Sequence, residues 1–387
     1  MKAFVTGGSG FVGSNLIQRL VSSGHRVRAL ARSKNAREAI VHMGAEPVEG
    51  DLADVKALCA GMSGCETVFH CAAAMEFWNE EHLQEQVNIE GPRNVLHACE
   101  KSGVSCLVFI SAAAVLSTGG PVRSLSENDP LPANPFGAYA RSKAAAESLV
   151  LSANSSTLRT VAVRPPAIWG LGDSHFLPEI IRAVRSKQFL WVNKGLYPYE
   201  TCHVRNVCEG AVLACRKGTG GQAYFLTDTE KTTFREFITG LLATQGIPPG
   251  SLSLPWSAAW ASAIFLEGLW RLFHSRGRPP ITRTLLALIG TPIELSDSTA
   301  RKELGYAGRV TRRAGLEELR HAFSHLPPSA IQPPKSSLRR ISLARSAKSL
   351  HTDAKPEEKR REDHEQSFNV APLFCVRHRH GSACHRA

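Results

Sequence analysis

The chain has 387 residues, of which 43% are hydrophobic and 21% are charged. This composition is ordinary for a soluble globular protein and excludes disorder over most of the length. The length is suitable for two domains followed by an appendage. The formal net charge is +12, but the residues from Pro327 onward carry 12 Lys or Arg against 6 Asp or Glu, so half of the excess belongs to the C-terminal tail. The remainder suits a site for a small anionic molecule, and we expect no nucleic-acid partner.

Ten cysteines are scattered along the chain without a C-x-x-C pair. Some of them, such as Cys71 and Cys106, lie in apolar runs where a free thiol behaves as a small buried hydrophobic group. No apolar leader precedes the first predicted strand. We therefore expect reduced thiols in a cytoplasmic protein, with membrane association as a second expectation, and we expect no metal site.

The first half of the chain alternates apolar runs with amphipathic helical stretches. The runs are continuously apolar, as in strands that are buried on both faces. Strands are predicted at 3–6, 27–31, 47–49, 67–70, 106–111 and 160–164, with helices between them. This order predicts an α/β fold with a doubly wound parallel sheet of Rossmann type, and a first domain that spans 1–174.

After Gly170 the pattern is less regular, with helices predicted at 177–186 and 232–244 and a strand in the segment QAYFLTD. We interpret 175–326 as a smaller mixed α/β domain that binds the substrate and interleaves with the sheet of the first domain. From 327 to 387, prolines and a stretch rich in Ser, Arg, Lys and Glu predict a disordered basic tail.

The segment TGGSGFVG at 6–13 follows the first strand and opens an amphipathic helix. Glycines allow a tight turn and a close backbone approach, so that N–H groups at the helix start can bind a pyrophosphate. A glycine-rich loop without a ligand is the plainer interpretation, but the strand before it and the helix after it favour binding. The residues predicted to bind the dinucleotide here are Gly7, Gly10, Phe11, Val12 and Gly13.

The end of the second strand indicates which dinucleotide is bound. An NAD-binding domain usually has a carboxylate there for the ribose 2′-hydroxyl, whereas this chain has Arg28, Arg32, Ser33 and Lys34. Cationic side chains at this position suit the 2′-phosphate of NADP. We therefore expect NADP, with Arg32 as its ligand and NAD as the alternative.

Two short segments complete the predicted cofactor site. In the segment GDL, Asp51 is expected to accept a hydrogen bond from the adenine amino group, beside Leu52, although an aspartate fits equally well as the cap of a helix that begins near Asp54. After the fourth strand, the small residues Ala72 and Ala73 let the cofactor lie close to the backbone.

The segment YARSK places Tyr139 and Lys143 four residues apart, on one face of a predicted helix. A neighbouring ammonium, together with the positive nicotinamide ring, is expected to lower the pKa of the phenol toward the range of general acid/base catalysis. The spacing is common by chance. The Tyr139/Lys143 motif becomes a specific signal through its context, because it follows the glycine turn and five predicted strands and precedes another strand.

These motifs, together with VFHCAA, VNIEGPRNVL and VRPPAIWGLGD, resemble the extended short-chain dehydrogenase/reductase superfamily from Met1 to about Phe323. The segments RPPITR and ARKELGY are similar to its 3β-hydroxysteroid dehydrogenase-like branch, which includes sterol-4-carboxylate dehydrogenases and 2-alkyl-3-oxoalkanoate reductases. The resemblance implies an NAD(P)-dependent oxidoreductase that interconverts a secondary alcohol and a ketone, and it implies a homodimer.

The resemblance also implies roles for the residues that match the family pattern. Tyr139 is the implied acid/base, and Lys143 holds the nicotinamide ribose. Asn88 supports the site from a neighbouring helix, and Pro165 with Pro166 borders the nicotinamide.

One position departs from the family pattern. Where the family has a second serine that binds the substrate oxygen, this chain has Ala112. We take Ser111 as the candidate for that hydroxyl, with Ser117 and Thr118 in reserve. Neighbouring residues on a strand face opposite ways, so Ser111 can serve only if the strand ends or bulges there.

The segment 254–273 is unusually apolar and contains three tryptophans, with Glu267 and Arg271 as its full charges. We expect first a helix that covers an apolar pocket or joins the core, second an interfacial helix in peripheral contact with a membrane, and third a membrane span. An apolar cover favours a hydrophobic substrate, of the steroid or long-chain 3-oxo acid type, over a nucleotide sugar.

Two other functions stay open at this point. A nucleotide-sugar epimerase or dehydratase shares the first domain, and a non-catalytic NAD(P)-binding regulatory protein is made credible by Ala112. His203, in the segment CHVRN, is expected to be structural, since a lone histidine is more often structural than catalytic.

Overall fold

The computed structural model describes residues 1–75, 78, 81–273 and 277–324, all of which belong to one compact unit. The tail that the sequence predicts to be disordered, 327–387, lies outside the described residues.

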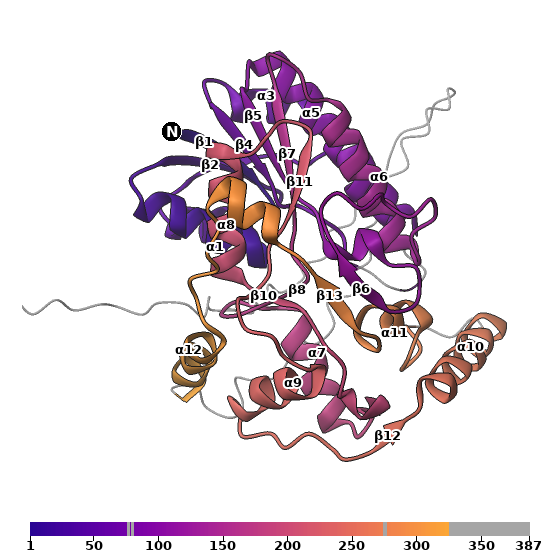
Figure 1. Cartoon of the computed structure of the whole chain (residues 1–387). Helices are drawn as coiled ribbons and strands as arrows, with labels where there is room; N and C mark the ends of the chain where they lie inside the picture. Colours follow the sequence, from indigo (N-terminus) through magenta and orange to yellow (C-terminus); the bar gives the residue numbers. More distant parts are fainter. Residues whose placement is uncertain (76–77, 79–80, 274–276, 325–387) are drawn as a thin grey trace, which may run out of the picture. The chain divides into compact units, whose positions relative to one another are not determined.

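A sheet of seven parallel strands forms the centre of this unit, in the order β11-β7-β5-β4-β1-β2-β3 (Figure 1). Its strands are β1 (Lys2–Thr6), β2 (Arg26–Ala31), β3 (Glu46–Glu49), β4 (Thr67–His70), β5 (Cys106–Ile110), β7 (Arg159–Arg164) and β11 (Gln222–Phe225). The six strands predicted from the first half are all present, with ends within one residue of the prediction. The doubly wound parallel fold is confirmed.

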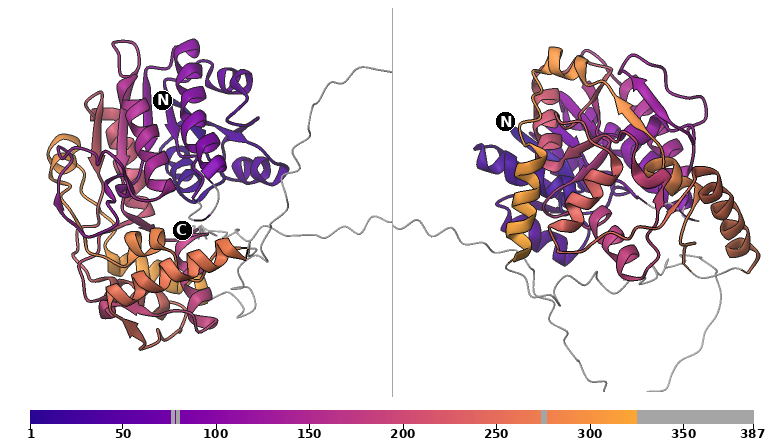
Figure 2. Two further views of the ribbon diagram at one scale, coloured as in Figure 1. Left: turned by 90° about the vertical axis from the view of Figure 1, so that its right-hand side faces the viewer. Right: turned by 60° about the horizontal axis from the view of Figure 1, so that its bottom comes forward.

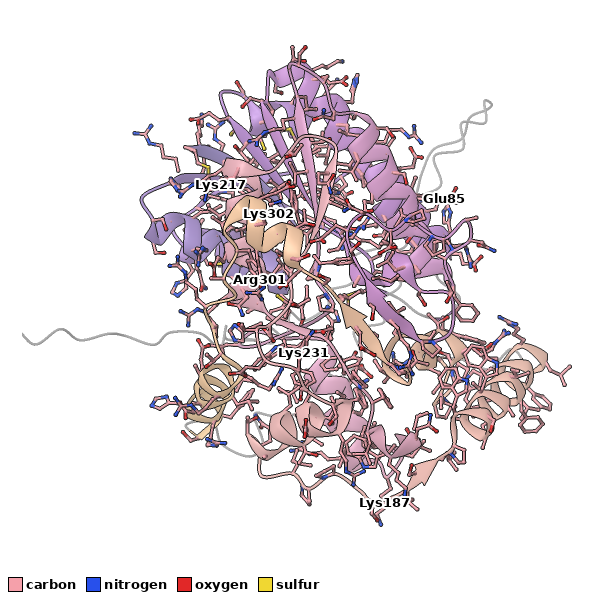
Figure 3. The ribbon with its side chains drawn as sticks, in the orientation of Figure 1. Glu85, Lys187, Lys217, Lys231, Arg301 and Lys302 are labelled. Atoms are coloured by element: carbon pink, nitrogen blue, oxygen red, sulfur yellow. The ribbon has the colours of Figure 1, made fainter. Side chains whose placement is uncertain are left out.

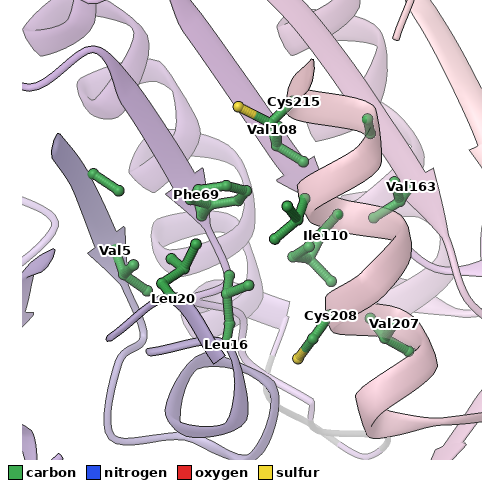
Figure 4. Close-up of a cluster of buried hydrophobic side chains, with 14 of the residues drawn as sticks. Val5, Leu16, Leu20, Phe69, Val108, Ile110, Val163, Val207, Cys208 and Cys215 are labelled. Atoms are coloured by element: carbon green, nitrogen blue, oxygen red, sulfur yellow. The ribbon is translucent and has the colours of Figure 1, made fainter. Parts of the chain in front are cut away.

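Helices cover both faces of this sheet. One face carries α1 (Phe11–Ser22), α2 (Lys34–His42) and α8 (Val204–Lys217), and the other carries α3 (Val55–Met62), α5 (Gly91–Ser102) and α6 (Ala138–Ser152). Along β5, Val108 and Ile110 face α1 and α8, whereas Leu107 and Phe109 face the other layer, as the two-residue period of a strand requires. Figure 4 shows the first of these clusters, where α1 and α8 meet the strands.

The order of the strands reverses between β1 and β4, because β2 and β3 extend the sheet to one side and β5, β7 and β11 to the other. Open α/β sheets bind their ligands at such a point, beyond the carboxyl ends of the strands. The glycine turn after β1, Ala72 after β4 and Ser111 after β5 all follow strand ends at this edge.

The residues after Trp169 form a second, smaller region (Figures 1 and 2). Its helices are α7 (Phe176–Arg185), α9 (Phe234–Ala243), α10 (Trp256–Leu272), α11 (Arg283–Ile289) and α12 (Arg312–Ser324). Two two-stranded sheets join it to the first half: β8 (Ala167–Trp169) with β10 (Thr201–His203), and β6 (Val122–Leu125) with β13 (Ile293–Leu295). A third, β9 (Trp191–Val192) with β12 (Ser253–Leu254), lies within the second region. The remaining short elements are α4 (Glu81–Glu85), η1 (Gln86–Glu90), η2 (Ala113–Leu116), η3 (Asn193–Gly195) and η4 (Ala300–Leu304).

This second region has an aromatic core of its own, which includes Trp169, Trp191, Phe234 and Phe237. However, α8 and β11 return from it to the large sheet, where β11 pairs with β7. The two regions therefore share one sheet although each has a separate core.

Charged side chains are distributed over many elements of the surface. The labelled Lys187, Lys217, Lys231 and Lys302 lie on separate segments (Figure 3), and Lys231 forms an ion pair with Glu200. Within the part of the chain that the structure describes, no helix has both the length and the apolar character needed to cross a bilayer, and α10 has 17 residues.

Candidate active site

The glycine turn between β1 and α1 is packed so tightly that two of its positions have no room for a side chain. A Cβ on Gly7 would lie 2.7 Å from the backbone nitrogen of Ala72, and a Cβ on Gly13 would lie 2.1 Å from the carbonyl oxygen of Gly7. Gly7 also has a φ of +67°, which side-chain-bearing residues rarely adopt. The backbone of the turn and the loop after β4 therefore lie in direct contact.

The first turn of α1 follows directly from these glycines. Gly10 is the N-cap, with extended dihedral angles, and its N–H donates to the carbonyl of Gly7 at 3.0 Å. The N–H groups that begin a helix have no partner within it, and they carry the positive end of the helix dipole. Phe11, Val12 and Gly13 supply these groups, at the strand-order reversal where a pyrophosphate binds in this fold.

Arg32 and Asp51, both predicted to bind the cofactor, face each other across the ends of β2 and β3. Arg32 Nη1 lies 3.7 Å from Asp51 Oδ2, and the two side chains are 73% and 48% exposed. A pair this exposed is weak, so the guanidinium remains available to an anion. The alternative of Asp51 as a helix cap is wrong, because Asp54 caps α3 by accepting from the N–H of Ala57 at 3.0 Å.

The loop after β4 is held by buried hydrogen bonds. Thr6 Oγ1 lies 2.6 Å from His70 Nδ1, and the N–H of Ala72 donates to the same hydroxyl at 3.4 Å. Burial and the nearby Lys143 lower the pKa of His70 to about 3, so its ring is neutral. Ala72 is thereby fixed against Gly7, and Ala73 follows it directly in the chain.

Tyr139 and Lys143 lie on the buried face of α6, with 8% and 2% of their surfaces exposed. Lys143 Nζ donates to the carbonyl of Ile110, at the end of β5, at 2.7 Å and lies 4.1 Å from the centre of the Phe109 ring. The predicted pair of residues is therefore brought to the carboxyl end of the central strand β5.

The expected lowering of the pKa of Tyr139 is not produced by the surrounding side chains. Burial raises the pKa of Tyr139 to about 12. Burial also lowers the pKa of Lys143 to about 7, although Glu147 acts in the opposite direction, so the ammonium is held only weakly. The spacing of the pair does not indicate how deeply both groups are buried, and burial disfavours the charged form of each.

Asn88 connects the loop after β4 to the catalytic helix. It lies in η1, a single π-helical turn of the kind often found at functional sites, and its side chain is buried. Its amide accepts from the N–H of Ala74 at 2.8 Å and donates to the carbonyl of Ala74 and to Ser142 Oγ, both at 3.0 Å. These three hydrogen bonds fix the orientation of the amide, so Asn88 positions Ala74 relative to the helix turn between Tyr139 and Lys143.

Ser111 meets the condition set by the sequence, because β5 ends at Ile110. Its backbone N–H donates to the carbonyl of Val163 at 2.8 Å, while its buried Oγ has no hydrogen-bond partner among the described residues. Ala112 follows with extended dihedral angles, and the N–H of Ala113 donates to the carbonyl of Pro165 at 2.9 Å. The end of β5 is thus tied to Pro165, which is predicted to border the nicotinamide.

The sequence reasoning missed a buried ion pair behind the catalytic helix. Glu147, four residues after Lys143, accepts from Arg164 at 2.6 Å, and the two side chains are 0% and 6% exposed. Breaking such a pair leaves an uncompensated buried charge. The signal was available in the repeated spacing of Tyr139, Lys143 and Glu147, which places all three on one face of α6.

His203 is fully buried, with its ring 4.8 Å from Trp169 in an edge-on arrangement. Burial and the nearby Arg205 lower the pKa of His203 to about 4, so the ring is neutral. Its backbone N–H donates to Asp228, which also accepts from the Trp169 indole and from Asn206. These contacts tie β8, β10 and α8 together and are consistent with the structural role expected for His203.

The residues of this edge fit a dinucleotide. The turn at Gly7 and Gly13 presents bare backbone, and the free N–H groups of α1 suit a pyrophosphate. Ser111 Oγ is a buried hydroxyl without a protein partner, at the strand end that is tied to Pro165. Buried polar groups are normally paired, so an unpaired hydroxyl at this edge fits a ligand oxygen.

Comparison with known proteins agrees with this geometry. Residues 4–256 match the 3-beta hydroxysteroid dehydrogenase/isomerase family. The chain is 45% identical over 322 residues to 4-hydroxy-2-methyl-3-oxo-4-farnesyl-3,4-dihydroquinoline-1-oxide ketoreductase of Stigmatella aurantiaca, covering 83% of this chain and 96% of that protein. It is 32% identical over 326 residues to the decarboxylating sterol-4-alpha-carboxylate 3-dehydrogenase of Dictyostelium discoideum, covering 82% and 99%.

A solved structure supports the fold independently. The UDP-glucuronic acid 4-epimerase from Bacillus cereus in complex with NAD has a TM-score of 0.64 and 18% identity, covering 84% of this chain and 100% of that one. Likeness at this identity concerns the fold alone. With the family match and the two relatives, these findings show that the chain belongs to the 3-beta hydroxysteroid dehydrogenase/isomerase family of extended short-chain dehydrogenases/reductases, and that it is an oxidoreductase dependent on a nicotinamide cofactor.

Proposed function

We propose that the protein interconverts a secondary alcohol and a ketone on a hydrophobic substrate, with NADP as its preferred cofactor and Tyr139 as its acid/base. The observation that carries this proposal is the position of Tyr139 and Lys143. Both are buried on one face of α6, and Lys143 reaches the end of β5 beside the loop that packs on the glycine turn. This arrangement brings a proton donor to the edge of the sheet where the fold binds a dinucleotide.

In the reaction, the bound cofactor supplies or accepts a hydride. Tyr139 donates its phenolic proton to the carbonyl oxygen in the direction of reduction and accepts a proton from the alcohol in the direction of oxidation. Its high pKa in the buried site keeps it protonated, which suits the role of donor to a ketone. Lys143 holds the nicotinamide ribose, and Ser111 donates a hydrogen bond to the substrate oxygen.

Asn88 is proposed as a positioning residue. It touches neither reacting atom, but it connects Ala74 to Ser142 within α6. Loss of this connection would displace the loop that lines the cofactor relative to the catalytic helix. Displacements of about 1 Å cost on the order of 100-fold in rate where reacting groups must be aligned.

The preference for NADP rests on Arg32. The position directly after β2 carries this exposed arginine in place of the usual carboxylate, and its pairing with Asp51 at 3.7 Å is loose. A 2′-phosphate would compete well for the guanidinium, because charge-assisted bonds to phosphate are stronger than an exposed ion pair. Asp51 and Leu52 then line the part of the cofactor site that binds the adenine.

The hydrophobic character of the substrate is supported by the two named relatives, one acting on a farnesylated quinoline and one on a sterol carboxylate. We infer a substrate of the steroid or long-chain 3-oxo type. The alternative of a nucleotide-sugar enzyme is supported by likeness in fold to solved enzymes of that class at 18–23% identity, which concerns the fold alone. The alternative of a non-catalytic binding protein is weakened by the free hydroxyl of Ser111 beside Ala112.

Further parts of the proposal concern the location, partners and domain roles of the enzyme. We infer a cytoplasmic homodimer in which 1–174 binds the cofactor and 175–326 binds the substrate. We also infer that 254–273 makes peripheral contact with a membrane, and that nucleic acid is not a partner.

The test is oxidation of NADPH and NADH by the purified protein with a 3-ketosteroid, a 2-alkyl-3-oxo acid and a UDP-sugar. Turnover of an apolar ketone with NADPH preferred is the expected result.

Tyr139→Phe should lower kcat by about 10³-fold and leave cofactor binding unchanged. Arg32→Ala should weaken NADPH binding about tenfold and leave NADH binding unchanged, since it removes one charge-assisted contact. Cofactor binding without turnover of any ketone would contradict the proposal.

A further inference from the structure

A row of three side chains crosses the large sheet at the end opposite the candidate active site. Thr67, Cys106 and Arg159 are the first residues of β4, β5 and β7. The strand register places Cys106 directly opposite Thr67 on one side and Arg159 on the other. Residues that are paired in this way on neighbouring strands point to the same face of the sheet. All three side chains therefore face the layer of helices that contains α8.

Cys215, in the last turn of α8, lies over this row. Its Sγ is 3.4 Å from Thr67 Oγ1, and the thiol of Cys106 donates to its backbone carbonyl at 3.8 Å. The two thiols also interact with each other through a hydrogen bond. Figure 4 shows Cys215 at the end of α8, beside Val108 of β5. Cys106 and Cys215, which we call the thiol pair, are both free thiols and are 4% and 6% exposed.

Arg159 binds both members of the thiol pair. Its Nη2 lies 3.6 Å from Cys106 Sγ and also donates to the backbone carbonyl of Cys215. Its Nη1 donates to the carbonyl of Gly218, the C-cap of α8, at 2.7 Å. These bonds satisfy carbonyls that the end of a helix leaves without partners. They also hold a guanidinium beside the thiol pair, where a cation favours a thiolate.

Two cysteines of α8 that face the sheet differ in acidity. Cys208 and Cys215 are about two turns apart, and both belong to the core cluster under α8. Burial raises the pKa of the Cys208 thiol to about 12. Hydrogen bonds from Cys106 and Thr67 lower the pKa of Cys215 to about 7, although burial acts in the opposite direction. Arg159 lowers it further, so Cys215 is partly ionised at neutral pH, and the thiolate is the nucleophilic form of cysteine.

The thiol pair lies directly beneath the surface. Cys106 follows the exposed Ser105, and Cys215 precedes the exposed Arg216. Arg159, which contacts both thiols, is half-buried and extends from the pair toward solvent. A neutral oxidant of the size of hydrogen peroxide therefore has a short path to the pair.

We propose that Cys106 and Cys215 are a modification site at which a peroxide oxidises the thiol pair to a disulfide. The Cys215 thiolate attacks one peroxide oxygen, so that an S–O bond forms and the O–O bond breaks. The hydroxide that leaves takes up the proton released earlier by Cys215 and becomes water. The sulfur of Cys106 then attacks the sulfur of Cys215, so that the S–S bond forms and the S–O bond breaks. The proton of Cys106 goes to the departing hydroxyl, which leaves as a second water, and the peroxide gains the two electrons that the sulfur atoms lose.

The disulfide joins the two predicted domains, because Cys106 belongs to 1–174 and Cys215 to 175–326. It closes a long loop, and a cross-link over a long loop constrains the unfolded chain strongly. The candidate active site lies at the other end of β5, where Lys143 binds the carbonyl of Ile110. The bond should therefore stabilise the fold and leave the binding of NADPH unchanged. Neither effect depends on the identity of the substrate.

The bond is detected by peptide mapping of the full chain under non-reducing conditions, before and after treatment with hydrogen peroxide at neutral pH. The expected product is a pair of peptides joined through Cys106 and Cys215, lighter by two hydrogen atoms than the free peptides, which dithiothreitol separates. Cys208 is the control within the same helix, and its thiol should stay free. The unfolding temperature should rise by at least about 5 °C on oxidation and return on reduction.

Three variants separate the roles of the residues. Cys106→Ser should leave Cys215 as a sulfenic acid that dimedone labels, because the thiol that resolves it is absent. Cys215→Ser should leave Cys106 unmodified. Arg159→Gln should slow oxidation at neutral pH at least about tenfold, since loss of the cation leaves less thiolate.

Cys65→Ser is the matched control for the cysteine variants. Cys65 is 3% exposed, its thiol donates to the carbonyl of Gly61 at 3.5 Å, and burial raises its pKa. This variant should form the disulfide between Cys106 and Cys215 as fast as the wild type does.

Two outcomes would overturn the inference. In the first, peroxide leaves the two thiols of the pair free or joins either of them to a different cysteine. In the second, dimedone labels Cys106 in Cys215→Ser as readily as it labels Cys215 in Cys106→Ser. The first outcome is read from the wild type, so it decides the matter even if a serine variant does not fold.

Discussion

Two glycines, one in the turn after β1 and one in α10, show how differently the two regions are built. Gly13 has no room for a side chain, because a Cβ there would lie 2.1 Å from the carbonyl oxygen of Gly7. Gly268, on the exposed side of α10, has nothing within 4 Å of the same position. The glycine turn of the first region excludes side chains because its backbone is packed closely, whereas the outer face of α10 leaves open space for a side chain at Gly268.

The largest expected effect comes from a methyl group at Gly13. Gly13→Ala should abolish measurable NADPH binding, a weakening of more than about 100-fold, because the added Cβ forces the turn away from the pyrophosphate position. Gly268→Ala is the matched change in the other region. It should raise the free energy of unfolding by about 0.5–1 kcal/mol, since alanine is the better helix former at a position with open space. Fluorescence titration and thermal unfolding measure the two effects.

The comparison would break if the two alanine variants behaved alike. Normal cofactor binding by Gly13→Ala would mean that the turn can open without loss. Destabilisation by Gly268→Ala would mean that the outer face of α10 is packed against something in solution.

The next effect concerns the end of β5. Ser111→Ala should lower kcat by about 10²–10³-fold, the usual loss of one donor to a developing oxyanion, and leave the Kd of NADPH unchanged. The double variant Ser111→Ala with Ala112→Ser moves the hydroxyl by one residue. It should stay as slow as Ser111→Ala if the free Oγ of Ser111 is the one that binds the substrate oxygen. Recovery of activity would assign the role to position 112 instead. Steady-state kinetics with a soluble ketone measure all three proteins.

The smallest effect depends on pH. Burial lowers the pKa of Lys143 from 10.5 to about 7, so the free protein loses this ammonium as the pH rises through 7. An anionic cofactor favours the ammonium, and linkage then predicts that the Kd of NADPH rises by up to about tenfold per pH unit above 7. Lys143→Arg, which keeps its charge, should show a flat profile. A flat profile in the wild type would show that Lys143 stays charged without the cofactor.

The same shift affects stability. The folded pKa lies below that of the unfolded chain, so between about pH 7 and pH 10 the unfolded chain binds a proton that the folded one does not. The free energy of unfolding should therefore gain a rising contribution from Lys143 over this range. Urea denaturation of the wild type and of Lys143→Met across this range separates that contribution from the rest.

The fold and the glycine turn could be predicted because their signals are local. Each buried strand is a short apolar run, and the glycines stand in a fixed order between a strand and a helix. The shared helix face of Tyr139 and Lys143 could also be predicted from the helical period, and the strands before and after the motif made it specific. The lowered pKa of Lys143 could not be predicted from the sequence. The residues that contact Lys143, Phe109 and Ile110, belong to β5 and precede it by more than thirty residues.

Other parts depend on contacts between distant segments. The Asp228 side chain accepts from Trp169 and Asn206, residues that no short motif joins. The neighbours of α10 decide which of its faces is exposed. The segment 254–273 is apolar on nearly all sides, so its sequence does not indicate which face is covered. Asn88 could be singled out only by resemblance, since its partners Ala74 and Ser142 come from elements on either side of it.

The strand that completes the large sheet, β11, is synthesised much later than its partner β7. Strand β11 spans Gln222–Phe225 and pairs with β7, which ends at Arg164. While the chain is being synthesised, β7 is complete long before its partner has left the ribosome, and its open edge presents unpaired N–H and C=O groups to other chains. A fragment that stops at residue 174 would keep the predicted nucleotide-binding residues yet retain this open edge permanently. Such a fragment should aggregate, and the length of chain between the two strands sets the time for which the nascent protein needs protection.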